Sequence, residues 1–255
     1  MINDTIFSKE YMHYISLGYN CYVASDLEKL GLRDSAYPFD WIKSDWTSVE
    51  FFIRTNFENF LIYDNLYQHK NSLNAYIDKV YNIDFLHDFD KKHSLKKQLD
   101  KVRNKYMRRA ARFYESAKSP TLFIRYIRNE NELEYLKKNY SSVIELLKSF
   151  CADNDIVFIC SDVFTRDEAY IPNMVLVKKR EEQEFIDNPI MLSEELTALL
   201  KDKNYPDREK NLTFLKEKEK RKESERNVQS SSLQRRIKRA YERRFLTDYV
   251  HSKQC

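Results

Sequence analysis

Cys21 follows a glycine and an asparagine at a spacing that suits nucleophilic chemistry. The pattern predicts a short strand at 13–17 and a tight turn through Gly18, one of only two glycines in the chain. It then predicts a helix over 21–30 that is capped by Asn20. Because amide N–H groups and the helix dipole favour a thiolate at the first turn of a helix, we expect a lowered pKa for Cys21.

Two roles remain open for this cysteine. In the first, Cys21 attacks a carbonyl carbon, Gly18 lets the backbone approach the substrate, and the following N–H groups stabilise the oxyanion. Gly18 and Asn20 would then contact the substrate. In the second, Cys21 is a small buried hydrophobe without a chemical function.

His87 is the best-placed base among the five histidines of the chain. Ile83, Phe85 and His87 alternate with other residues, which predicts one face of a strand, and His87 stands where that strand ends. Side chains at such ends often line a site, so we expect His87 to accept the proton of the thiol. A histidine with a purely structural role is the alternative.

Asp40 is the expected third catalytic residue. It lies in a turn after Pro38, between Phe39 and Trp41, and these aromatic rings would desolvate its carboxylate or fix its orientation. Trp41 is an expected substrate contact. A surface turn held by two aromatic side chains is the alternative interpretation.

Arginines supply the candidate anion-binding groups. A long helix predicted over 93–118 has a strongly basic outer side that includes Arg108 and Arg109. Such a face is usually solvated, but single arginines, Arg108 in particular, can turn into a cleft and bind a substrate phosphate. Arg125, in a buried-looking strand, is a further expected substrate-binding residue.

The elements that position these residues are those of an α/β protein. Strands at 121–127 and 155–162 flank an amphipathic helix at 130–151, which predicts a βαβ unit with a parallel strand pair over 121–162. A further apolar run at 173–179 predicts another strand. We therefore expect a three-layer α/β domain with a partly parallel sheet, whose binding groups gather at the carboxyl ends of the strands.

Charge divides the chain into two predicted parts, an α/β domain over 1–204 and a basic helical tail over 205–255. The tail holds 15 Lys and Arg against 8 Asp and Glu. Within it, 233–250 predicts a basic amphipathic helix suited to an anionic membrane surface or an acidic protein, or one that packs on its own domain. Nucleic acid is not an expected partner, because no recognised reading module accompanies the charge.

Composition favours a cytoplasmic protein, with peripheral contact at the inner membrane surface through the tail. The chain has 255 residues, 42% of them hydrophobic, and a mean hydropathy of −0.71 with no long apolar run or secretory signal. Its four cysteines form no CxxC or Cys/His cluster. We expect reduced thiols, no metal and no resident cofactor.

Five motifs in order carry a family resemblance: SLGYNC with its helix, YPFDW, FLHDF, KYMRRAARF and LFIRY. Their succession from about Tyr14 to Asp162 resembles a bacterial family described as papain-like cysteine peptidases. The resemblance implies that Cys21 is the nucleophile and His87 the base. The third member stays open among Asp40, Asp88 and Asp162.

The resemblance and the residues together predict a cysteine hydrolase of peptidase or amidase type that acts on an unidentified acyl or peptide substrate. The turn before the cysteine helix is also similar to that of a capsule-polysaccharide acetyltransferase family that uses coenzyme A. An acyltransferase in cell-surface polysaccharide biosynthesis is therefore one alternative. A non-catalytic binding protein with a docking tail is the other.

Overall fold

The computed structural model describes residues 2–70, 72–164, 171–178 and 186–226. By its internal contacts the chain divides into a unit of residues 1–211 and a second unit of residues 212–255. A helix runs over 208–226, while the predicted amphipathic helix at 233–250 lies outside the described residues. No helix among the described residues is both long enough and apolar enough to cross a membrane.

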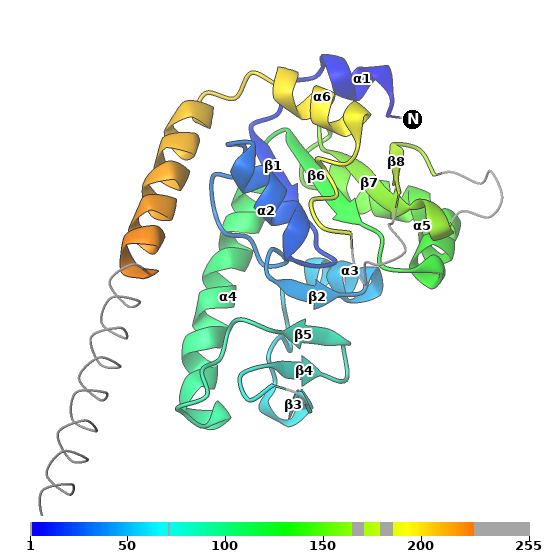
Figure 1. Ribbon diagram of the computed structural model, residues 1–255. Coiled ribbons are helices and arrows are strands. Elements are labelled where there is room, and N and C mark those ends of the chain that lie inside the picture. The colour runs from blue at the N-terminus through cyan, green and yellow to red at the C-terminus, as the bar shows by residue number, and fades with distance from the viewer. Residues whose placement is uncertain (1, 71, 165–170, 179–185, 227–255) are drawn as a thin grey trace, which may run out of the picture. The chain divides into compact units, whose positions relative to one another are not determined.

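The first unit contains α-helices and two four-stranded sheets (Figure 1). Its helices are α1 (Asp4–Ser8), α2 (Cys21–Lys29), α3 (Trp46–Arg54), α4 (Leu95–Ala117), α5 (Glu130–Lys148) and α6 (Glu194–Asp202). Its strands are β1 (His13–Ser16), β2 (Ile42–Ser44), β3 (Leu66–Gln68), β4 (Tyr76–Asp78), β5 (Ile83–Phe85), β6 (Thr121–Tyr126), β7 (Asp155–Ser161) and β8 (Met174–Val177).

The larger sheet is parallel throughout, with the strand order β1-β6-β7-β8. The predicted βαβ unit is confirmed, because β6 and β7 pair in parallel and α5 connects them. The predicted fourth strand is also confirmed as β8. Parallel strands that are buried on both faces read as continuous apolar runs, which is why these segments were recognisable in the sequence.

Helices cover both faces of this sheet, so the predicted three-layer arrangement is confirmed (Figure 1). Alternate side chains of one strand enter different cores, as period-two geometry requires. Ile15 of β1 belongs to the core shared with α3, α4 and α5. The preceding Tyr14 belongs to the core shared with α2 and α6.

The smaller sheet is antiparallel, with the order β2-β5-β4-β3. It meets the larger sheet at the turn after β1, where the Ser44 N–H donates a hydrogen bond to the carbonyl oxygen of Tyr19 at 3.0 Å. In its register Lys43 lies opposite Asp84. This sheet therefore brings the segment that leads to His87 toward the part of the chain that contains Cys21.

Apolar residues at helical spacing over 46–61 predict a helix through that whole range, but α3 ends at Arg54. Asn56 adopts a left-handed conformation, with φ of 52°, and the Phe57 N–H reaches back to the carbonyl oxygen of Phe52 at 2.9 Å. This bond closes the helix end in the manner of a Schellman motif. Phe57 and Phe60 still enter the core, but from a turn.

Candidate functional site

Cys21 is the first residue of α2 and is half-buried. The side-chain oxygen of Asn20 accepts a hydrogen bond from the Tyr22 N–H at 3.0 Å, so the predicted cap is confirmed. This bond uses the Tyr22 N–H and one lone pair of the Asn20 oxygen, so the expected substrate contact of Asn20 has the other lone pair and the amide nitrogen available.

Cys21 lies beyond the carboxyl end of β1, at the same edge of the parallel sheet as the ends of β6 and β7. In parallel α/β sheets this edge is where ligands bind. The edge near Cys21 is aromatic, since the rings of Tyr19 and Tyr126 meet edge to face at 5.7 Å. The Arg128 guanidinium lies 5.7 Å from the centre of the Tyr19 ring.

The expected depression of the Cys21 pKa is wrong. Burial raises the pKa of the Cys21 thiol, and the carboxylate of Asp187 adds to this effect. The residue's own backbone N–H and the ammonium group of Lys43 act in the opposite direction without reversing it. The helix terminus does favour the thiolate, but the loss of water around a half-buried sulfur outweighs it.

Lys43 and Asp187 were missed by sequence reasoning. Asp187 also accepts a hydrogen bond from the Tyr22 hydroxyl, and this bond is the main reason that the pKa of Tyr22 is raised to about 12. No local signal pointed to Asp187, because it lies far from Cys21 in the sequence. Lys43 follows the YPFDW motif by two residues, and only the position of β2 brings its charge to Cys21.

Gly18 has a positive φ of 87°, as a tight turn requires. A Cβ atom at this position would lie 3.0 Å from Arg125 Nη1 and 3.0 Å from Ser44 Oγ. The glycine therefore makes room for the protein's own side chains. The expectation that it admits a substrate is corrected accordingly.

Arg125 is fully buried, which corrects its expected role as a substrate-binding residue. Its Nε and Nη2 donate to the carboxylate of Glu132 at 2.8 and 2.7 Å. Its Nη1 and Nη2 also donate to the carbonyl oxygens of Leu17 and Ser44, both at 2.7 Å. These bonds hold the turn before Cys21, and the buried guanidinium has no surface on which a substrate could bind.

Asp40 is also buried and holds its own turn. Its Oδ2 accepts hydrogen bonds from Arg33 Nη2 and from the Tyr37 N–H, both at 2.8 Å. Burial raises the pKa of Asp40, while Arg33 and Arg109 lower it in part. Trp41 is half-buried, with the Arg33 guanidinium 5.5 Å from its ring centre.

These contacts give Asp40 a structural role. Among the described residues it makes no hydrogen bond to a histidine. Of the other acids considered, Asp88 accepts a hydrogen bond from the Tyr106 hydroxyl at 2.9 Å and pairs with Lys105. Asp162 directly follows β7 at the carboxyl edge of the sheet.

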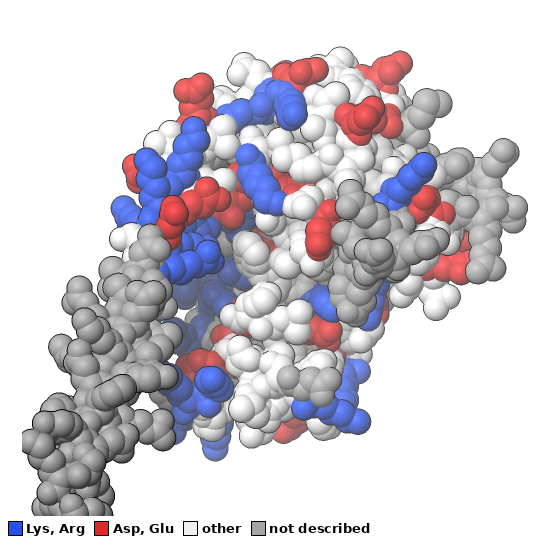
Figure 2. Space-filling model, viewed as in Figure 1, with Lys and Arg blue, Asp and Glu red and all other residues white. Residues whose placement is uncertain are grey.

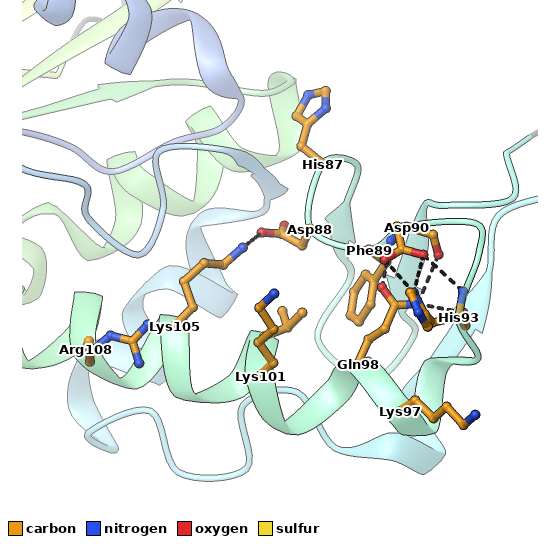
Figure 3. A pocket seen from close by; sticks show the side chains of 11 residues that line it. His87, Asp88, Phe89, Asp90, His93, Lys97, Gln98, Lys101, Lys105 and Arg108 are labelled. Carbon is orange, nitrogen blue, oxygen red and sulfur yellow. Dashed lines mark hydrogen bonds and ion pairs between the residues drawn. The ribbon is translucent and has the colours of Figure 1, made fainter.

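His87 lies just after β5, which ends at Phe85, and its side chain is exposed. It borders a hollow of about 510 Å³ beside α4, which Arg108 also lines. Figure 3 shows the imidazole turned away from the other labelled side chains of this hollow. In the described part of the chain no hydrogen bond joins His87 to Cys21, and His87 is not among the groups that shift the pKa of Cys21.

Within the described residues no group of three or more His, Cys, Asp or Glu side chains is arranged to hold a metal ion. Three kinds of group are available for chemistry around Cys21. These are the thiol of Cys21, the nearby Lys43 ammonium and the N–H groups at the start of α2.

The fold and this edge of the sheet define an α/β protein with a half-buried thiol at the start of its first long helix. Residues 12–163 match the model of the family described as "Putative papain-like cysteine peptidase (DUF1796)". The match covers more than half of the chain, and the chain belongs to this family.

The chain is also similar to a curated protein of a virus. The "Uncharacterized protein R408" of Acanthamoeba polyphaga mimivirus is 31% identical over 180 residues, which cover 62% of this chain and 76% of the relative. This relative is viral, so a bacterial origin for the present chain stays a prediction. No solved structure matches the chain.

Proposed function

We propose that this chain is a cysteine-nucleophile hydrolase that cleaves an acyl bond through a thioester on Cys21. The observation that carries the proposal is the position of Cys21 at the first turn of α2, beyond the carboxyl end of β1. Membership of a family described as cysteine peptidases supports the same class of chemistry. The natural acyl or peptide substrate is not part of the proposal.

In the first step the sulfur attacks the acyl carbon, a C–S bond forms, and the bond to the leaving group breaks. The thiol proton passes through the base to the leaving nitrogen or oxygen. Water then attacks the thioester, which releases the acid and restores the thiol. The backbone N–H of Cys21, which already faces its own sulfur, is the proposed oxyanion donor.

A base is needed because burial raises the pKa of Cys21, so the sulfur is mainly a neutral thiol near pH 7. We assign this role to His87. The pairing of Lys43 with Asp84 places the start of the His87 segment next to a residue whose charge reaches Cys21. Asp40 is left out of the mechanism, since Arg33 and the Tyr37 N–H already bind its carboxylate.

Acylation by p-nitrophenyl acetate tests the proposal, with each cysteine followed by peptide-resolved mass spectrometry. Cys151 is the internal control, because it is half-buried like Cys21 but lies after the end of α5. We expect Cys21 to be acylated at least about tenfold faster than Cys151. We also expect water to remove the acyl group from Cys21, so that the reaction turns over.

The base is tested in the same assay with His87→Gln, and His93→Gln serves as the matched control because His93 is an exposed histidine of the same connection. Acylation of Cys21 should fall by about tenfold or more in the first variant only. Equal, slow acylation of Cys21 and Cys151 would favour the non-catalytic alternative. A thioester that resists water but passes its acyl group to an added amine or sugar would favour an acyltransferase.

A further inference from the structure

A hollow with a volume of about 510 Å³ lies beside α4. One wall is the basic side of α4, which contributes Lys101, Lys105 and Arg108. The opposite wall is the connection after β5, which includes Asp88 (Figure 3). A volume of this size is within the range of small-molecule sites.

The two acidic side chains that line the hollow already interact with other side chains of the protein. Asp88 forms an ion pair with Lys105 and accepts a hydrogen bond from the Tyr106 hydroxyl. Asp90 shares a hydrogen bond with His93 Nδ1 at 3.0 Å. Lys101 and Arg108 have no acidic partner among the described residues. The hollow therefore carries uncompensated positive charge.

Helix geometry concentrates this charge. Lys101, Lys105 and Arg108 are separated by four and three residues, so they share one face of α4. Asp88 already compensates the charge of Lys105, so the charges left without an acidic partner among the described residues are those of Lys101 and Arg108. Figure 2 shows Lys and Arg side chains gathered along the side of the molecule that α4 forms.

Arg109, the next residue, adds a further observation. Its guanidinium lies 5.1 Å from the ring centre of Tyr106, the residue that holds Asp88. Its Nη1 is buried and has no hydrogen-bond partner among the described residues. The Asp40 carboxylate already interacts with the Arg109 charge, and Arg109 does not line the hollow, so this charge belongs to the surroundings of the hollow rather than to the hollow itself.

We propose that this hollow binds the phosphate groups of a small phosphorylated molecule. Arg108 supplies a planar fork that can donate two hydrogen bonds to one phosphate, and Lys101 supplies a second cation about two turns away along α4. Lys105 and Asp88, which form an ion pair, line the hollow together with these two cations. The inference does not depend on Cys21, because it concerns binding alone.

Isothermal titration of the full chain with inorganic pyrophosphate at low salt tests this site. The test variant combines Lys101→Gln with Arg108→Gln. The control combines Lys96→Gln with Lys148→Gln, which removes two exposed charges that do not line the hollow. We expect the test variant to bind pyrophosphate at least about tenfold more weakly and the control to bind within about twofold of the wild type.

Cosedimentation with vesicles of phosphatidylcholine and phosphatidylglycerol separates a soluble ligand from a membrane surface. Binding of pyrophosphate that depends on Lys101 and Arg108 supports the proposal. Three results overturn it: no saturable binding of pyrophosphate at low salt, equal weakening in test and control variants, or vesicle binding without pyrophosphate binding. Cys21 acylation is measured separately, so failure of this site and failure of the hydrolase proposal are distinguishable.

Discussion

Arg125 and Glu132 form a fully buried ion pair that fastens the two sheets together next to Cys21. Two nitrogens of Arg125 donate to the Glu132 carboxylate, and the same guanidinium holds the carbonyl oxygens of Leu17 and Ser44. Glu132 Oε2 also accepts the Trp46 N–H at 3.2 Å. The end of β1, the end of β2 and the starts of α3 and α5 therefore meet at one charge pair.

Glu132→Gln should destabilise the protein strongly, because it leaves the buried Arg125 guanidinium without its counter-charge. Breaking a buried pair in this way costs about 3 kcal/mol or more in free energy of unfolding. Urea denaturation followed by circular dichroism measures the change. Glu134→Gln is the control, since Glu134 pairs with Lys137 on the exposed side of the same helix. Equal free energies of unfolding of the two variants would show that the buried pair does not stabilise the fold.

Gly18→Ala should also destabilise the fold, for two separate reasons. Its φ of 87° is unfavourable for alanine, and the new Cβ would lie 3.0 Å from Arg125 Nη1 and Ser44 Oγ. We expect a loss of about 2 kcal/mol or more in thermal or urea unfolding. Gly31→Ala, at a φ of 71° after α2, is the comparison for conformational strain. A smaller loss at Gly18 than at Gly31 would contradict this account.

The parallel sheet could be predicted because its strands are buried on both faces and read as apolar runs around α5. The role of Arg125 could not be predicted from its neighbours. A charged residue in an apolar strand suggested a ligand at the sheet edge, whereas its partner Glu132 lies in the next helix. A carboxylate in the first turn of the helix that follows the strand was the signal that sequence reasoning passed over.

The end of α3 shows a different limit of sequence reasoning. Apolar residues kept helical spacing as far as Phe60, but Asn56 and Asn59 take positive φ values and end the regular pattern. Asparagine tolerates this conformation better than most residues, so both positions carried a signal for a turn. The relation of His87 to Cys21 had no such signal, because it depends on how two sheets pack.

The pKa of Cys21 should respond in opposite directions to its two charged neighbours. Lys43 lowers this pKa and Asp187 raises it. Since the thiolate is the reactive form, Lys43→Gln should slow alkylation by iodoacetamide at pH 8, and Asp187→Asn should accelerate it, each by about threefold. Rates measured from pH 6 to 10 should show the profile moved to higher pH in the first variant and to lower pH in the second.

Two exposed charges provide controls for this experiment. Lys96→Gln and Glu58→Gln remove a positive and a negative charge that are not among the causes of the Cys21 shift. Their pH profiles should coincide with that of the wild type. Profiles of Lys43→Gln and Asp187→Asn that also coincide with that of the wild type would show that burial alone, without the local charges, sets the reactivity of the thiol.

The hydroxyl of Tyr106 should stabilise the connection that carries His87. Tyr106 has no exposed surface and donates to Asp88 at 2.9 Å, and burial together with Asp88 raises its pKa well above the ordinary value, so it remains a donor. Tyr106→Phe removes one buried hydrogen bond and should cost about 1 to 2 kcal/mol in urea unfolding. Amide exchange of residues 86–90 should become faster, because Asp88 then keeps Lys105 as its one side-chain partner within the described part of the chain.

Tyr63→Phe, at a tyrosine that is 49% exposed, is the control for this change and should leave stability nearly unaltered. A loss of stability in Tyr106→Phe without faster exchange at 86–90 would place the effect in the aromatic core, where Tyr106 also meets Phe60 and Phe85. Faster exchange confined to 86–90 would show that the hydroxyl holds this connection against α4. In that case Tyr106→Phe should also weaken pyrophosphate binding, since Asp88 and Lys105 line the hollow and would be held less firmly.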